Sequence, residues 1–314
     1  MLYRISFTTE KIMKKMNEYL AQHATDEMSE AEMQELLERF MDEHNRSLPG
    51  KRLTEKTART AEDFLQLAEE ASSEKAAFRF AKKALALEPN NMDAKRVWLN
   101  YAPLDPFERF RLLEKAVQEG REQMEKQGLN DEESIGHYWG ILETRPYMRL
   151  LNDYVDDMLQ SGMYGKAMAV CEEMLRLCEN DNLGKRFTLM HLYAFFENEL
   201  AALGLLKKYN DHDETQMMVA LSVLYYKLGQ WNKADEYLQR AQKINKDVKK
   251  FFHCIFEQSY EKLSDSMEPG CYQPYTAEEL IVEMMENDFL FHSTPGFMLW
   301  ADRQLQRRKT RKQK

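Results

Sequence analysis

The stretch Ala77-Phe-Arg-Phe-Ala-Lys-Lys-Ala-Leu-Ala-Leu-Glu-Pro89 decides the fold class of this 314-residue chain. Ala77, Ala81 and Ala84 recur at the spacing of one helix face, which predicts a helix that packs closely against a neighbour. Pro89 ends that helix, because proline cannot donate the next backbone hydrogen bond. An apolar-periodic segment with Phe64 lies just before it, across the Ser72-Ser73 turn. The local pattern is therefore a pair of helices.

The same pattern recurs further along the chain. Ala167, Ala201 and Ala234 are separated by 34 and 33 residues, and Gly162 and Gly229 stand five residues before two of them. Small residues at this period predict points where paired helices cross, with the glycines in the turns between them. Each pair needs neighbours to bury its remaining apolar face, so we expect several pairs to stack.

This period and placement resemble the tetratricopeptide repeat. The best match is Ala77, Ala84-Leu85, Leu87 and Pro89, and further units are expected at 92–126, 148–181, 182–214 and 215–248. The resemblance implies an all-α, tetratricopeptide-like α-solenoid, which is a right-handed superhelix of helix pairs. We expect a helical amino-terminal region at 1–50, repeats at 58–260, a helical cap at 261–302 and a basic tail at 303–314.

A narrower resemblance covers most of the chain. The strings Gly136-His-Tyr-Trp-Gly140, Glu143-Thr-Arg-Pro-Tyr-Met-Arg149 and Asn180-Asp-Asn-Leu-Gly-Lys-Arg186 are similar to those of a bacterial family of tetratricopeptide-like proteins. Phe40-Met-Asp-Glu-His-Asn45 and Thr294-Pro-Gly-Phe297 fit this family too, whereas Cys178-Glu179 replaces its usual Asn-Pro. Most members have no assigned function, so the resemblance implies an architecture and a bacterial source.

Composition and capping signals favour helices throughout. The chain has only 12 glycines and 8 prolines, which disfavours turn-rich β architectures. Ser29-Glu-Ala-Glu32 and Thr276-Ala-Glu-Glu279 match the capping box that opens helices. Thr294-Pro295 reads as the N-cap and first residue of a last helix. No sheet is expected beyond a short extended start near Leu2–Phe7.

Charge and cysteine content limit the setting of the protein. The net charge is −9 although the tail, Arg303–Lys314, carries seven basic groups and no acid. The acidic body should repel nucleic acid and anionic membranes. Cys171 and Cys178 are too far apart on a helix for a disulfide, so we expect reduced, buried thiols. With neither a signal peptide nor a membrane span in view, the expected location is the cytoplasm.

No motif predicts catalysis, a metal or a cofactor. The chain lacks a phosphate-binding glycine loop, H-E-x-x-H and G-x-S-x-G. Asp211-His212-Asp213 has the residue types of metal ligands, but we expect it in a solvated turn. His253-Cys254 could act as base and nucleophile only if folding aimed the two side chains at each other, and neighbours on a helix diverge. We therefore expect a protein that is not an enzyme and carries no cofactor.

A concave groove is the predicted binding site. In tetratricopeptide proteins the first helix of each pair lines the concave surface, which implies peptide binding as the commonest use. The register places seven residues there: Arg149, Asn152, Asp156, Arg186, Tyr193, Tyr226 and Lys227. Tyr193 and Tyr226 are expected to be exposed along the groove with no core to fill. The predicted function is a non-enzymatic scaffold or adaptor that binds a protein or peptide.

Two segments leave alternatives open. His137–Arg149 concentrates Trp139, Arg145 and Tyr147, which suits either a binding hot spot or the filling of a structural joint, with Arg145 paired to a carboxylate such as Glu143. The basic tail could bind nucleic acid or form a disordered, solubilising end, and we favour the latter. Its deletion is expected to leave the fold intact. A nucleic-acid-associated protein that acts through the tail is the alternative function.

Overall fold

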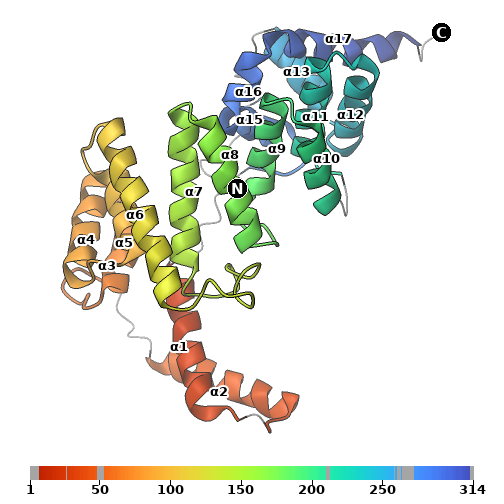
Figure 1. Cartoon of the computed structure of the whole chain (residues 1–314). Coiled ribbons are helices and arrows are strands. Elements are labelled where there is room, and N and C mark those ends of the chain that lie inside the picture. The colour runs from red at the N-terminus through yellow and green to blue at the C-terminus, as the bar shows by residue number, and fades with distance from the viewer. Residues whose placement is uncertain are drawn as a thin grey trace. The chain divides into compact units, whose positions relative to one another are not determined.

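The computed structural model describes residues 7–25, 27–47, 53–209, 213–257, 259, 263 and 272–311. Every regular element within these ranges is a helix, which confirms the predicted all-α class (Figure 1). The expected extended start near Leu2–Phe7 lies outside the described residues, except that Phe7 opens the first helix. The described helices include none long and apolar enough to cross a membrane.

The chain forms two compact units, residues 4–157 and residues 158–314. The first unit contains α1 (Phe7–His23), α2 (Glu30–Ser47), α3 (Ala61–Glu69), α4 (Glu74–Leu87), α5 (Met92–Tyr101), α6 (Pro106–Lys126) and most of α7 (Arg145–Gln160). The second contains α8 (Tyr164–Leu177), α9 (Lys185–Phe195), α10 (Glu199–Lys208), α11 (Thr215–Lys227), α12 (Trp231–Ile244), α13 (Val248–Phe256), α15 (Ala277–Glu286), α16 (Asp288–Ser293) and α17 (Pro295–Arg311).

Several helices begin where the sequence offers a capping side chain. The predicted box at Ser29 is present, because the Glu32 carboxylate accepts a hydrogen bond from the Ser29 backbone N–H at 2.8 Å. At the second predicted box, Thr276 accepts from the backbone N–H of Glu278, while Glu279 accepts from that of Tyr275. Pro295 opens α17, as predicted. These contacts satisfy donors that the first turn of a helix leaves unpaired.

Alanines mark the helix crossings, with one correction to the predicted register. The fourth residue of α4, α8, α10 and α12 is an alanine with an exposure of 2% or less: Ala77, Ala167, Ala202 and Ala234. The predicted Ala201 is only half-buried, and its neighbour Ala202 takes the crossing position. The repeat spacing alone does not distinguish Ala201 from Ala202. Because α10 begins at Glu199, its fourth residue is Ala202.

The second unit uses the same turn three times. Gly162, Glu197 and Gly229 each have a positive φ, of 71°, 57° and 69°. The amide of each bonds the carbonyl three residues back, and the next amide bonds the carbonyl five residues back. This pair of backbone hydrogen bonds is the Schellman motif, which ends a helix. The sequence pattern missed the middle turn, because glutamate there adopts the left-handed conformation that usually favours glycine.

Candidate functional site

Arg149, the first predicted groove residue, is buried in the first unit rather than open to a ligand. Its side chain is 13% exposed and lies between Glu10 of α1 and Asp93 of α5. Two guanidinium nitrogens donate to the Glu10 carboxylate at 2.7 and 3.0 Å, and two donate to Asp93 at 2.8 and 2.6 Å. This double bidentate geometry joins α7 to two other helices.

The electrostatics of this cluster favour the ionised forms of Arg149 and Asp93. Burial alone would raise the pKa of Asp93, but the guanidinium of Arg149 outweighs it and lowers that pKa below its ordinary value. Burial acts against the charge on Arg149 as well, and the two carboxylates more than restore it, so the pKa of Arg149 rises. A buried cation that two anions hold serves packing rather than proton transfer.

Asn152 and Asp156 lie on the solvent side of the same helix. Asn152 is half-buried, Asp156 is exposed, and the Asn152 amide donates to the Asp156 carboxylate at 3.3 Å. Arg149 turns into the protein, so the structure brings only two of the three predicted α7 residues together at the surface. The adjacent Asp153, with a side-chain exposure of 15%, is instead engaged by α5: it accepts from the Asn100 amide at 3.0 Å and lies 3.6 Å from the guanidinium of Arg96. The open polar pair on this helix is therefore Asn152 and Asp156.

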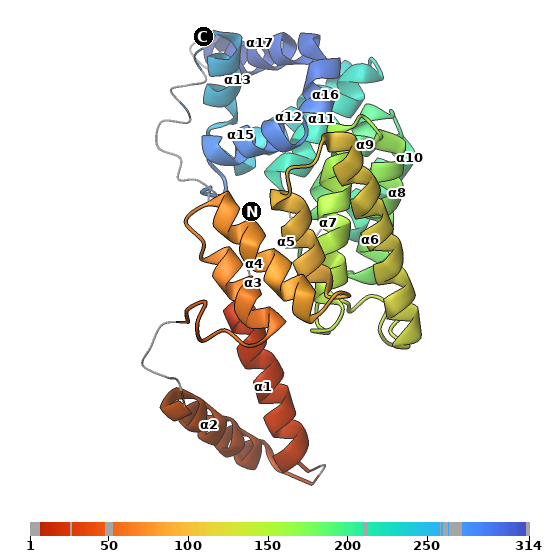
Figure 2. The same ribbon diagram turned by 90° about the vertical axis from the view of Figure 1, so that its left-hand side faces the viewer.

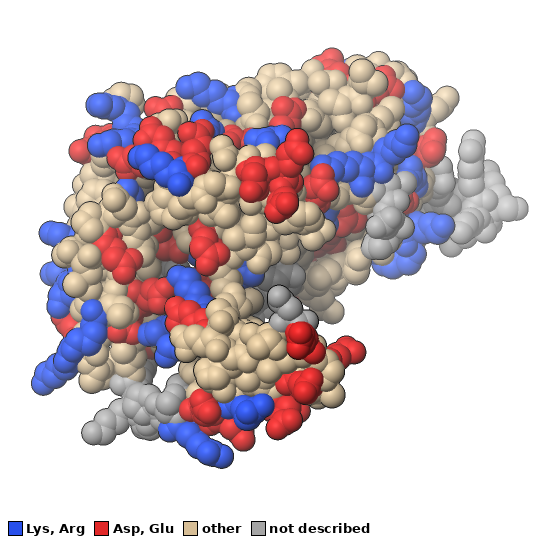
Figure 3. All heavy atoms as spheres, turned by 60° about the horizontal axis from the view of Figure 1, so that its bottom comes forward, with Lys and Arg blue, Asp and Glu red and all other residues tan. Residues whose placement is uncertain are grey.

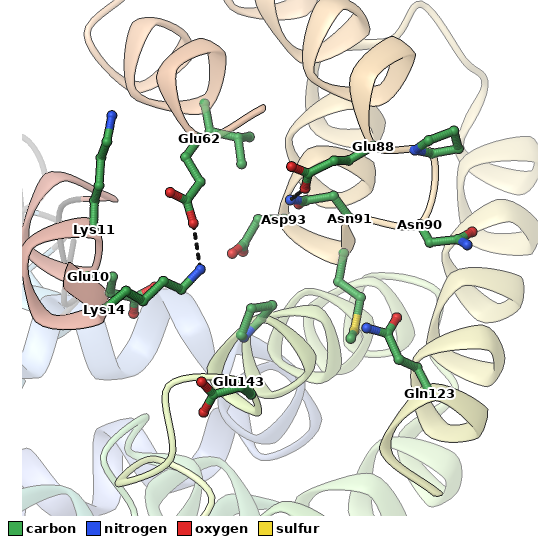
Figure 4. A pocket seen from close by; sticks show the side chains of 14 residues that line it. Glu10, Lys11, Lys14, Glu62, Glu88, Asn90, Asn91, Asp93, Gln123 and Glu143 are labelled. Carbon is green, nitrogen blue, oxygen red and sulfur yellow. Dashed lines mark hydrogen bonds and ion pairs between the residues drawn. The ribbon is translucent and has the colours of Figure 1, made fainter. Parts of the chain in front are cut away.

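A cavity of about 410 Å³ opens beside the Arg149 cluster (Figure 4). Its walls carry the carboxylates of Glu10, Glu62, Glu88, Asp93 and Glu143, the amides of Asn90, Asn91 and Gln123, and the ammonium groups of Lys11 and Lys14. Lys14 pairs with Glu62 at 2.6 Å, as the dashed line in Figure 4 shows. Lys11 pairs with Asp63 behind the wall. Both ammonium groups are thus engaged with protein carboxylates.

In the second unit, Arg186 and Tyr193 of α9 are both engaged with other side chains of the protein. Arg186 is 2.9 Å from Asp181 and 2.6 Å from Glu214, which precedes α11. Tyr193 is 7% exposed, and its hydroxyl donates to Glu172 at 2.7 Å. Burial and that carboxylate raise the pKa of Tyr193 above its ordinary value. The expectation that Tyr193 has no core to fill is wrong.

Tyr226 and Lys227 close the carboxy-terminal end of α11. Tyr226 is half-buried among the rings of Trp231, Phe297 and Trp300, with centroids 5.1 to 5.5 Å away. It packs within a half-buried aromatic cluster, whereas an open groove position was expected. The Lys227 ammonium donates to the carbonyls of Ala194 and Phe195, at the end of α9. Burial lowers the pKa of Lys227.

The chain itself covers the face on which this groove was expected. All residues of α11 from Thr215 to Tyr225 are buried, and most of α9 is buried too. Helices α15 and α16 pack against α11 and α9 (Figures 1 and 2). Phe289 of α16 meets Phe195 edge to face, with a centroid distance of 5.6 Å. The carboxy-terminal helices therefore cover parts of α9 and α11, two of the helices that were expected to line a groove.

Two glutamates of α15, Glu279 and Glu283, are buried in this contact, and no sequence motif predicted a role for them. Glu283, 1% exposed, shares a hydrogen bond of 3.0 Å with His191 Nε2, and its second oxygen has no hydrogen-bond partner among the described residues. Burial raises the pKa of Glu283 and raises that of Glu279 to about 7. The sequence feature that could have predicted their burial is their position beside Leu280 and Ile281, on the apolar stripe of this helix.

The His137–Arg149 segment is structural in the described unit. Tyr138, Trp139 and Tyr147 are each at most 9% exposed. Arg145 donates to the Trp139 carbonyl at 2.7 Å, with its guanidinium carbon 5.6 Å from the centre of that ring. Its carboxylate partner is Glu10, at 3.6 Å, rather than the expected Glu143.

The other candidate residues that the structure describes have structural rather than catalytic surroundings. Cys171 and Cys178 are free thiols with exposures of 0% and 4%, as predicted. Asp211 and His212 lie outside the described residues, and Asp213 pairs with Arg240. In the part of the chain that the structure describes, no three His, Cys, Asp or Glu side chains are placed to hold a metal ion.

The basic tail begins inside a helix, which corrects the expectation of a disordered end. Helix α17 continues to Arg311, and residues 312–314 lie outside the described part. Leu305 is 3% exposed, and Lys249 donates to its carbonyl at 2.8 Å. Deleting the tail from Arg303 would therefore remove a packed side chain. On the face in Figure 3, basic and acidic side chains are interspersed over the surface.

Comparison of the sequence with known families and curated proteins identifies no relative from which a function could be inferred. No family model matches the chain. No curated protein sequence is similar to it. The resemblance to tetratricopeptide proteins therefore rests on the residues and spacings quoted for it.

Proposed function

We propose that this chain is a tetratricopeptide-like α-solenoid protein that binds a protein or peptide and is not an enzyme. The observation that carries the proposal is the repetition in the second unit. A Schellman turn at Gly162, Glu197 and Gly229 precedes a helix with alanine at its fourth residue each time. Stacked repeats of this kind are extended surfaces suited to binding other chains.

Contacts between successive pairs support stacking. The Lys208 ammonium donates to the carbonyl of Leu175, 33 residues earlier, and Lys227 donates to Ala194, also 33 residues earlier. Lys233 pairs with Glu199 across 34 residues. Contacts at one repeat length are expected when each pair lies on the pair before it.

The buried charges fit a scaffold better than a catalyst. Arg149 and Arg186 are each held by two carboxylates, and Lys227 is held by two backbone carbonyls. A catalytic acid or base must exchange a proton near neutral pH and must lie within reach of a substrate. These cations instead join helices to one another.

The α7 face of Asn152 and Asp156 is the part of the predicted groove most suited to a ligand. It presents one amide and one carboxylate at the surface, joined by a hydrogen bond of 3.3 Å. Amides can bond the backbone of an extended peptide, and carboxylates can pair with its basic side chains. We propose a peptide segment that carries lysine or arginine as the ligand.

A peptide display library selected on the immobilised protein tests this proposal. Peptides with basic residues should be enriched, and Asn152→Ala with Asp156→Lys should weaken their binding at least about tenfold, the scale of one lost charge-assisted contact. Melting temperature should hardly change, because both side chains face solvent.

The matched control is Gln118→Ala with Glu122→Lys. These residues form an equivalent exposed hydrogen bond of 3.2 Å on α6. Selected peptides should bind this variant as they bind the unchanged chain. Enrichment without a basic preference, or equal binding to both variants, would place the binding surface elsewhere on the protein.

A further inference from the structure

His191 of α9 and Glu283 of α15 form a buried pair, and their side chains are 0% and 1% exposed. His191 Nδ1 lies 2.8 Å from the carbonyl oxygen of Phe187. A carbonyl oxygen can only accept a hydrogen bond, so Nδ1 carries a hydrogen and donates it. In a neutral imidazole the other nitrogen, Nε2, then has a lone pair and no hydrogen.

The contact between Nε2 and the carboxyl group of Glu283 therefore needs a proton of its own. Nε2 lies 3.0 Å from Glu283 Oε1, which is a hydrogen-bond distance, and two acceptors cannot form such a bond. Either a protonated Glu283 donates to a neutral His191, or a doubly protonated His191 donates to the carboxylate. Both arrangements contain the same number of protons, so the pair is neutral as a whole and holds one proton between its two side chains.

The surroundings of Glu283 favour the form that holds this proton. Its second oxygen, Oε2, is buried and has no hydrogen-bond partner among the described residues, and the same is true of the side-chain oxygen of Asn287 one turn further on. The Asn287 amide nitrogen donates to the backbone carbonyl of Glu283 instead. No described donor therefore reaches Oε2 to stabilise a carboxylate, and burial raises the pKa of Glu283.

The titratable groups on the α15 side of the pair are acidic. Glu279 stands one turn before Glu283, and the two carboxyl groups disfavour each other's ionisation. Tyr272 precedes the helix, and both carboxyl groups contribute to raising its pKa. Asp247, which precedes α13, accepts from the backbone N–H of Ala277 at the start of α15. None of these groups compensates a negative charge on Glu283.

The helices on the other sides supply no cation to the pair in the part of the chain that the structure describes. The buried residues of α11, Thr215–Tyr225, include no charged side chain. Helix α16 buries apolar residues, and its Phe291 ring lies 5.9 Å from the His191 ring. Arg186, in the first turn of α9, is held by Asp181 and Glu214.

We propose that the proton shared by His191 and Glu283 makes the docking of α15 dependent on pH. Removing it leaves a buried carboxylate facing the Nε2 lone pair, and a buried charge without a partner is costly. Helix α15 has only ten residues, so its local opening can expose Glu283 to water. Above the ordinary histidine pKa of about 6.5, the two exposed groups would hold no such proton. Closing then takes up a proton and becomes less favourable as the pH rises.

Hydrogen–deuterium exchange of the full-length chain, read by mass spectrometry, tests this proposal. Because Glu279 also responds to pH, Glu279→Gln is the parent variant. After correction for intrinsic exchange rates, protection of its α15 amides should fall at least about tenfold between about pH 6 and about pH 9. With Glu283→Gln added, protection should stay constant within about twofold, because the glutamine amide donates to Nε2 at every pH.

The matched control adds Asp288→Asn to the same parent. Asp288 and His292 form another histidine–carboxylate contact, of 3.7 Å, but their side chains are 65% and 83% exposed. This control should keep the full fall in protection. Circular dichroism melting in mildly acidic solution shows whether each variant is folded. Constant protection in the parent, or an undiminished fall after Glu283→Gln, overturns the proposal.

NMR of the histidine ring nitrogens tests the shared proton directly. The His191 signals are identified by their loss in His191→Gln. At neutral pH, Nδ1 should carry a hydrogen and Nε2 should be hydrogen-bonded, whereas an exposed neutral histidine usually carries its hydrogen on Nε2. A His191 ring with a hydrogen on Nε2 alone would contradict the pairing. Neither measurement depends on peptide binding, so the proposed function can fail without affecting this result.

Discussion

At the scale of single residues, Arg149 is the clearest determinant of stability. Its guanidinium satisfies Glu10 and Asp93, each 6% exposed, on two different helices. Arg149→Ala would leave Glu10 and Asp93 with only the more distant guanidinium groups of Arg145 and Arg96, each 3.6 Å away. We expect a loss of at most about 3–5 kcal/mol in the free energy of unfolding, the scale for a buried charge that loses its partner. Urea unfolding followed by circular dichroism measures it.

A surface arginine is the control for that substitution. Arg39 is 58% exposed and lies 4.0 Å from Glu35 on the same helix. Arg39→Ala should change the free energy of unfolding by less than about 0.5 kcal/mol, because exposed ion pairs contribute little. Equal losses in the two variants would mean that water, rather than Arg149, compensates the buried carboxylates.

At the scale of helices, the contact between α6 and α7 depends on a residue without a side chain. A Cβ on Gly120 would lie 2.8 Å from Cδ2 of Tyr147, whose ring is 2% exposed and has no room to move. Gly120→Ala should destabilise by about 1–3 kcal/mol despite the better helix propensity of alanine. Thermal unfolding of the purified variant measures the change.

Gly165 in α8 offers the matched case, because a Cβ there would meet nothing within 4 Å. Gly165→Ala should therefore stabilise by up to about 1 kcal/mol through helix propensity alone. Opposite signs in the two variants would attribute the difference to packing. A stabilising Gly120→Ala would instead show that α6 and α7 can separate slightly at low cost.

At the scale of the whole molecule, stability should depend on pH through α15. Glu279 is buried, and its pKa is raised from the ordinary value of 4.5 to about 7. A raised carboxyl pKa means that the fold favours the neutral form, so its stabilising effect is complete below about pH 4.5 and is lost as pH rises through about 7. The buried Glu283 beside His191 acts in the same direction.

We expect the urea midpoint to fall on going from mildly acidic to mildly alkaline solution. The Glu279 contribution is on the order of 2–3 kcal/mol. Glu279→Gln should flatten this dependence, because the amide cannot ionise, whereas Glu286→Gln, at an exposed position of the same helix, should leave it unchanged. A Glu279→Gln curve as steep as that of the unchanged chain would contradict the assignment.

Local sequence signals predicted the helices, and distant contacts decided which surfaces remain open. The helix class, the capping box at Ser29 and the small residues at crossings follow from spacing of a few residues. The burial of α9 and α11 does not, because His191 meets Glu283 across 92 positions in the chain. Tyr193 and Tyr226 were therefore expected in a groove, whereas other parts of the chain pack around their rings.

The enclosure of α9 and α11 has a consequence for how this protein opens in solution. Their amide protons are shielded on every side, so exchange with deuterated solvent should require the cooperative loss of the surrounding packing. The amides of α2, whose side chains are mostly exposed, should exchange through local fraying on a far shorter timescale. The slowest-exchanging amide protons of the native protein would then be those of α9 and α11, the two helices with the least access to water.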